Sequence, residues 1–284
     1  MPAIKHILFP FDFSKQGSLA IPFVHTIASR HGAEVSVLSV MPPVWNAPPG
    51  GIPPLPGLDA PEHELRACLD QALAQQFAGL VTHHLADLGD PARKIVEFAH
   101  NKGVDLIMMP THGLSGYRSM LLGSVTVEVL HEAKCPVWIA THADEQQSPT
   151  APRTIACAID DSPQTGTIMR WASEFSQRMG AALSFLHVLP PVSDALMIPS
   201  ESEFQEEVRK GLQTKLESIR QAMRADGDVR VVAGGIAETV TAEARREGAD
   251  LIVIGRGLLP SPLGRLRSNA YAINQQSPCP VLSV

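Results

Sequence analysis

The chain is poor in aromatic residues, and it lacks both a long apolar run and an excess of positive charge. Phenylalanine, tryptophan and tyrosine make up 5% of its 284 residues. No apolar stretch approaches the ~20 residues of a membrane-spanning helix, and no secretory leader is visible. The net charge of -6 provides no general surface for polyanions, which makes nucleic acid a poor candidate ligand. We therefore expect a cytoplasmic protein with no membrane or nucleic-acid partner.

Cysteine is also scarce, and its spacing argues against several kinds of site. None of the four cysteines forms a Cys-x-x-Cys pair, and the eleven histidines show no metal-ligand spacing, so we predict no metal site built from protein side chains alone. The sequence has no Walker A lysine motif and no Gly-x-Ser-x-Gly elbow. Three cysteines stand in apolar, strand-like runs and are interpreted as buried, reduced thiols: Cys135, Cys157 and Cys279.

What the chain does have is an internal repeat. Residues 104–113 are echoed by residues 249–257, and both copies close on the tripeptide Cys-Pro-Val. A repeat of this length indicates two copies of one domain. We place the domains at residues 1–143 and 153–284, with a short polar linker between them.

Each copy alternates strand and helix patterns. Short apolar runs predict buried strands, and their alternation with helices produces a parallel sheet covered on both faces. We therefore predict an α/β fold of two repeated Rossmann-like domains, each a five-stranded parallel sheet flanked by helices. The expected strands are residues 5–10, 34–40, 80–85, 104–109 and 137–140, then 154–159, 182–188, 229–233, 250–255 and 281–284.

In such folds, ligands bind outside the carboxyl ends of the strands, and the loop after the fourth strand carries a pattern suited to this. Gly113 is followed by nine residues and then by Gly123-Ser124-Val125-Thr126, which opens a helix. Glycines let a backbone approach a phosphate closely, and the N–H groups of a helix start bind the anion. The alternative is that the glycines only turn the chain and Ser124 only caps the helix.

These residues resemble the universal stress protein family, whose ATP-binding members show Gly-x-x-Gly, nine residues, and then Gly-Ser or Gly-Thr. Here the pattern reads Pro110-Thr111-His112-Gly113, residues 114–122, and Gly123-Ser124. The opening at residues 9–14, the strand end Val40-Met41-Pro42 and the closing Cys135-Pro136-Val137 are also similar to the family. The resemblance covers nearly the whole chain as a tandem pair. It implies the adenine nucleotide alpha hydrolase-like form of the Rossmann-like fold.

The resemblance also implies a binding site in the first domain for ATP or a similar adenine nucleotide, with Mg²⁺ as an expected companion. Asp12 and Val40 would meet the adenosine end, because a carboxylate suits ribose hydroxyls or Mg²⁺ and repels phosphate. The alternative role of Asp12 is a helix N-cap, for which Ser14 competes. Ribose and phosphates would lie on Gly113, Gly123, Ser124, Val125 and Thr126, with Pro10, Met109 and Pro110 completing the site.

Both copies depart from the family pattern. Pro110 stands where the first glycine is expected, and proline fixes φ and lacks an N–H. The first site is weakened if that glycine supplied a positive φ or a donor, and it is intact if the glycine only allowed a tight turn. In the second copy Arg267 stands where the first copy has Gly123, and Arg256 and Arg265 add positive charge. We interpret these arginines as a solvated loop, with an anion site as the alternative, and the second domain as a degenerate partner.

The sequence therefore predicts a universal stress protein that binds an adenine nucleotide in its first domain. The two domains are expected to form an intramolecular pseudo-dimer through their last strands, and a homodimer is a further option. The alternatives are a nucleotide-free interaction scaffold and a weak nucleotide hydrolase. The hydrolase ranks last, because only Asp12 and His112 could act as a general base beside the glycine loop.

Overall fold

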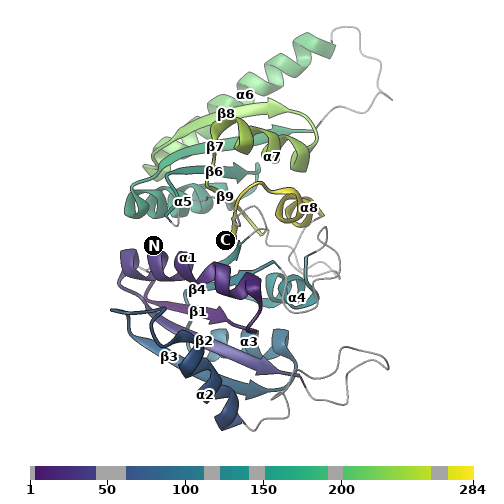
Figure 1. Ribbon diagram of the computed structural model, residues 1–284. Coiled ribbons are helices and arrows are strands. Elements are labelled where there is room, and N and C mark those ends of the chain that lie inside the picture. Colours follow the sequence, from purple (N-terminus) through teal and green to yellow (C-terminus); the bar gives the residue numbers. More distant parts are fainter. Residues whose placement is uncertain (1–3, 43–61, 112–121, 141–150, 191–200, 257–267) are drawn as a thin grey trace, which may run out of the picture. The chain divides into compact units, whose positions relative to one another are not determined.

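The computed structural model of the chain describes residues 4–42, 62–111, 122–140, 151–190, 201–256 and 268–284. These residues belong to two compact units, Pro2–Glu145 and Gln146–Val284, which are called domain 1 and domain 2 below. Each domain is described by itself (Figure 1). Within the described ranges, no helix combines the length and the apolar composition that crossing a membrane requires.

Domain 1 contains a parallel sheet with the strand order β3-β2-β1-β4-β5. The chain adds β2 and β3 on one side of β1 and then β4 and β5 on the other, so the direction of winding reverses between β1 and β4. In open α/β sheets this reversal marks the position where ligands bind. The strands are β1 (His6–Pro10), β2 (Glu34–Met41), β3 (Thr82–Leu88), β4 (Leu106–Pro110) and β5 (Val137–Ala140). The helices are α1 (Lys15–His31), α2 (Glu62–Leu73), α3 (Pro91–Asn101) and α4 (Ser124–Glu132).

Domain 2 repeats this winding with the order β8-β7-β6-β9-β10. The register repeats as well: Ile7 of β1 pairs with Val35 of β2, and their counterparts Ile155 and Leu183 pair in β6 and β7. The predicted fold of two Rossmann-like α/β domains is thus confirmed. The strands are β6 (Thr154–Ile159), β7 (Ala182–Leu189), β8 (Asp228–Ala233), β9 (Leu251–Ile254) and β10 (Val281–Ser283). The helices are α5 (Thr165–Met179), α6 (Glu201–Met223), α7 (Ile236–Glu247) and α8 (Ser268–Gln276).

Most strands lie where the apolar runs predict them, but β3 does not. It covers residues 82–88 rather than 80–85, because the chain is still turning at Gly79, which has φ +84. This strand is at the edge of the sheet. Val81, just before the strand, is 63% exposed, and Leu88, its last residue, is 51% exposed. The predicted strand therefore starts too early, at Leu80 and the exposed Val81, and stops before Leu88, which belongs to β3.

The cysteines largely follow their predicted burial. Cys157 and Cys279 are buried, whereas Cys135 is only half-buried, because it lies in the turn before β5 rather than in the strand. Burial raises the pKa of the Cys157 thiol well above its ordinary value. This thiol is therefore protonated and unreactive, as expected of a core residue.

In each domain one aspartate carboxylate connects the first and fourth strands, β1 and β4 in domain 1 and β6 and β9 in domain 2. Asp105 accepts hydrogen bonds from the backbone N–H groups of Lys5 and His6, at 2.8 and 3.0 Å. Asp250 does the same for residues 153–154, at 2.9 and 3.1 Å. Charged acceptors make stronger hydrogen bonds than neutral ones. The repeated aspartate thus acts at the amino end of the sheet and sets the alignment of the central strands.

We predict that Asp105→Ala lowers the free energy of unfolding by about 1–3 kcal/mol, because two backbone N–H groups lose a charged acceptor. Chemical denaturation measures this loss, and hydrogen exchange should show reduced protection in β1 and β4. Asp161→Ala is the control, since Asp161 makes a surface ion pair with Lys215 and its loss should cost at most ~1 kcal/mol. Equal effects of the two substitutions would show that Asp105 has no special role.

Candidate functional site

The carboxyl ends of β1 and β4 form the predicted edge in domain 1, and here the hydrogen-bonded ladder stops early. The last paired residues are Leu8 and Ile107, whereas the ladder between β6 and β9 continues to Ala158 and Ile254. Proline cannot donate to a ladder, and domain 1 has a proline at the end of each strand, Pro10 and Pro110. The two strands therefore end without pairing at the switch point of the sheet.

The turn after β1 is built around Asp12. Asp12 Oδ1 accepts a hydrogen bond from the backbone N–H of Ser14 at 3.0 Å. Ser14 Oγ in turn accepts from the N–H of Gly17 at 2.9 Å and caps α1. Ser14 is therefore the N-cap, and the alternative role of Asp12 as the cap is wrong. Gly17 leaves room for the carboxylate, since a Cβ there would lie 3.2 Å from Asp12 Oδ1.

The same turn holds a strained residue. Phe13 has φ +61, a left-handed conformation that costs a non-glycine residue on the order of 1 kcal/mol. Its ring packs 5.1 Å from that of Phe11, which lies 5.6 Å from Phe9, by ring centroids. Aromatic packing thus holds the backbone in a strained form next to Asp12. Strain of this kind is concentrated at functional turns.

The start of α4 is attached to the end of β4 by two sets of hydrogen bonds. The backbone N–H of Gly123 donates to the carbonyl of Thr111 at 2.9 Å. The buried hydroxyl of Thr126 donates to the carbonyls of Pro110 and Thr111, at 3.3 and 3.2 Å. Thr126 therefore fixes the position of the helix, and its hydroxyl is directed at the protein backbone rather than at a ligand.

The first turn of α4 differs from those of α1 and α3. Ser14 and Asp90 cap α1 and α3 with their side chains, but the N-cap of α4 is Gly123, and no side chain in the described part of the chain caps it. Ser124 is exposed and Val125 half-buried. The helix thus presents uncapped N–H groups and a hydroxyl at the carboxyl edge of the sheet.

The structure brings most of the predicted residues to this edge. Pro10 ends β1, Met109 and Pro110 are buried at the end of β4, and Gly123 begins α4. Val40 lies near the end of β2, next to β1, and is half-buried. Gly113 and His112 lie outside the described residues. The sequence motif does not identify Thr111 as a site residue, because only its backbone carbonyl takes part, as the acceptor that holds the start of α4.

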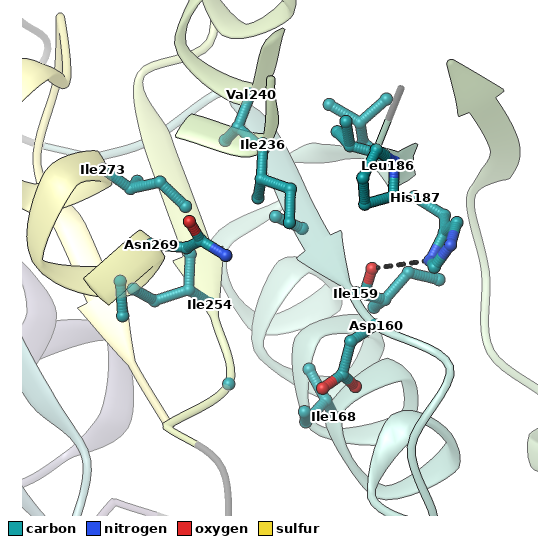
Figure 2. Close-up of a pocket in the computed structure, with 15 residues that line it drawn as sticks. Ile159, Asp160, Ile168, Leu186, His187, Ile236, Val240, Ile254, Asn269 and Ile273 are labelled. Carbon is teal, nitrogen blue, oxygen red and sulfur yellow. Dashed lines mark hydrogen bonds between the residues drawn. The ribbon is translucent and has the colours of Figure 1, made fainter. Parts of the chain in front are cut away.

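Domain 2 contains a cavity of about 250 Å³ at the carboxyl ends of β6, β7 and β9 (Figure 2). Asp160 and Val188, the counterparts of Asp12 and Val40, both line it. The copy that was interpreted as degenerate therefore has a cavity at the edge where a ligand is expected. Of the arginines interpreted as a solvated loop, Arg256 is buried, so the expectation is wrong for it. Arg265 and Arg267 lie outside the described residues.

The two domains fill the end of the fourth strand differently. Gly255 of domain 2 is the counterpart of Pro110, and a Cβ on Gly255 would lie 2.4 Å from Ile168 Cδ1. The counterpart of Ile168 in domain 1 is Ala20. Domain 1 thus combines a large residue on the strand with a small one on the helix, and domain 2 has the reverse. The glycine in domain 2 leaves room for Ile168.

Comparison with known proteins points to one family. A model of the universal stress protein family matches residues 3–141 and again 152–284. A universal stress protein of Mycolicibacterium smegmatis is 27% identical over 289 residues, covering 98% of this chain and 96% of its own. One from Methanocaldococcus jannaschii is 34% identical over 138 residues, covering 48% of this chain and 81% of its own.

Several solved structures are similar over nearly the whole chain. The crystal structure of a universal stress protein from Archaeoglobus fulgidus aligns with a TM-score of 0.69 at 22% identity, covering 98% of this chain and 95% of that one. A functionally unknown protein from Pseudomonas aeruginosa aligns with a TM-score of 0.73 at 16% identity, covering 99% and 92%. At these identities the likeness shows the shared fold alone.

We predict that Thr126→Val destabilises domain 1 by about 1 kcal/mol, because the two shapes are similar and only the hydroxyl donor is lost. Thr126→Ser keeps that donor and should retain most of the stability. Thermal or chemical unfolding of both variants measures the difference. The structural role assigned to the hydroxyl would be wrong if Thr126→Val were as stable as the parent protein.

Proposed function

The chain belongs to the universal stress protein family, and from this premise we propose that domain 1 binds ATP or a similar adenine nucleotide. The observation that carries the proposal is the uncapped first turn of α4 at the switch point of the sheet. Unsatisfied N–H groups and the helix dipole together favour an anion there. The phosphates would lie on Gly123, Ser124 and Val125.

Asp12 supports the other end of the proposed ligand. The Ser14 N–H and the space left by Gly17 hold its carboxylate at the end of β1, where it would accept hydrogen bonds from ribose hydroxyls. Mg²⁺ is usually bound by one or two carboxylates together with substrate phosphates, so Asp12 fits a metal carried by the nucleotide. Mg²⁺ would neutralise phosphate charge, while Asp12 and the α4 amides orient the two ends of the ligand.

Thr126 has a structural role in the proposed site rather than a contact with the ligand. Because its hydroxyl is directed at the carbonyls of Pro110 and Thr111, it would position the phosphate-binding turn rather than contact phosphate. Ser124 then remains as the hydroxyl donor of the motif. This assignment leaves the backbone N–H groups of α4 as the main phosphate contacts.

The alternative function is a nucleotide-free scaffold in the stress response. Pro110 favours it, since proline removes a backbone donor from the end of β4. A weak nucleotide hydrolase ranks last, because the sequence offers only Asp12 and His112 as a general base beside the glycine loop and Asp12 is engaged in the turn that caps α1. We therefore propose a binding protein rather than an enzyme.

We predict about one ATP–Mg²⁺ site per chain by calorimetric titration, with the site in domain 1. Gly123→Arg should abolish binding, because its side chain would occupy the phosphate position and the same residue stands in the second copy. Gly235→Arg is the matched control, since Gly235 is likewise a glycine N-cap without a side-chain cap, at the start of α7 in domain 2. Two equal sites, or none at saturating nucleotide, would contradict the proposal. Unfolding of the Gly123 variant, checked by circular dichroism, would not support it.

A second prediction concerns Pro110. Replacing it by glycine restores an N–H at the end of β4, so Pro110→Gly should tighten ATP binding by about 1 kcal/mol, the scale of one net hydrogen bond. This corresponds to about fivefold in Kd, measured by the same titration. An unchanged or weaker affinity would show that the site tolerates proline at this position.

A further inference from the structure

The cavity of domain 2 has a lining unlike that of a phosphate site. Its walls are mainly aliphatic side chains from β6, β7, β9, α5, α7 and α8. Neither lysine nor arginine is among the described residues that line it. The walls include Ile159, Ile168, Val240, Ile254 and Ile273, several of which are seen around the cavity in Figure 2.

Three polar side chains reach this aliphatic space, and they differ in their exposure. His187 is buried, and its Nδ1 donates to the carbonyl of Ile159 at 3.0 Å, so the protein itself fixes the ring. Asn269, in the first turn of α8, is exposed, and Figure 2 shows its amide turned toward the cavity. Asp160 enters from another side. Asn269 is therefore the exposed polar side chain of the lining, and most of the remaining wall is apolar.

A phosphorylated ligand does not fit this arrangement. Glycine at the end of the fourth strand would normally let a phosphate approach the backbone, but here Ile168 Cδ1 occupies the space beside Gly255, 2.4 Å from where its Cβ would be. The backbone at Gly255 is therefore not open to a phosphate.

The repeat shows which residues create the difference. Ile168 replaces Ala20, Asn269 replaces Val125 and Ala270 replaces Thr126. The first change adds aliphatic surface inside, and the second places an amide at the mouth. The third removes the hydroxyl that attaches the helix to β4 in domain 1. Together these changes convert the same edge of the fold from an anion site to an apolar one.

We propose that this cavity binds a small uncharged molecule with an aliphatic body and one hydrogen-bonding end. The body lies among Ile168, Ile254 and Ile273, and the polar end meets Asn269. A volume of about 250 Å³ lies below the ~300–1,000 Å³ of pockets for drug-sized ligands, which limits the ligand to a small molecule. The proposal does not depend on nucleotide binding in domain 1.

The test uses the full chain with isoleucine δ1 methyl groups labelled for NMR. Titration with 1-hexanol should give saturable shifts at Ile168, Ile254 and Ile273, while the buried Ile107 and Ile139 of domain 1 serve as internal controls. Hexanoate has the same aliphatic body with a negative charge, and it should bind about tenfold more weakly, because a desolvated charge beside a carboxylate is unfavourable. ATP should leave the three cavity methyl groups unshifted.

Two variants connect the signal to the cavity. Ala270→Leu fills the space and should abolish the shifts. Asn269→Val imports the residue of domain 1 and should weaken 1-hexanol binding about three- to fivefold, the effect of one hydrogen bond. Asn101→Val, an exposed position at the end of α3, is the matched control and should have no effect. If Ala270→Leu does not fold, the Asn269 variant still decides the question.

Several outcomes would overturn the proposal. They are the absence of saturable shifts at the cavity methyl groups, equal shifts at Ile107 and Ile139, and tighter binding of hexanoate or ATP than of 1-hexanol. An Asn269→Val variant that binds as well as the parent protein would remove the assigned role of the amide. Of these results, only ATP binding in the cavity would also bear on the titration of domain 1, because it would add a second nucleotide site to the chain.

Discussion

The pairing of the first strand with the fourth is the constraint on which each domain depends. Two backbone N–H groups at the start of the first strand donate to one carboxylate before the fourth, Asp105 in domain 1 and Asp250 in domain 2. With the amino ends joined in this way, the carboxyl ends of the two strands meet at one edge, where the winding of the sheet reverses. The repeated aspartate therefore acts at the amino end of the sheet, opposite the edge where a ligand is proposed to bind. It positions the opposite edge without contacting anything there.

At that opposite edge the two domains diverge on the same frame. In domain 1 the ladder between β1 and β4 ends at Leu8 and Ile107, and the helix that follows begins at an uncapped glycine. In domain 2 the ladder continues to Ala158 and Ile254, and aliphatic side chains line a cavity. Bare N–H groups at the start of α4 suit an anion, whereas branched aliphatic side chains suit an apolar molecule. The two proposals together assign the difference in ligand chemistry to a few substitutions at one edge.

Much of the fold follows from the sequence, because buried parallel strands are short apolar runs with caps and glycines at their boundaries. Ser14, Gly32 and Asp90 stand at the helix ends where their chemistry predicts them. The site is less predictable. A glycine motif identifies Gly123 and Ser124, but it does not say that the hydroxyl of Thr126 is directed at the backbone of β4. The cavity of domain 2 depends on aliphatic side chains from six elements, and no local pattern in the sequence brings them together.

The comparison of Pro110 with Gly255 shows why a motif position should be interpreted together with its packing partner. Read alone, proline in domain 1 indicates a damaged ligand site, and glycine in domain 2 indicates a retained one. The helix packed beside each strand adds a second explanation, since the smaller Ala20 accompanies proline in domain 1 and Ile168 takes up the space beside Gly255 in domain 2. Core packing constrains the summed volume of neighbouring side chains more tightly than the identity of either one. The glycine in domain 2 is therefore explained by Ile168, and it is not evidence for a phosphate site.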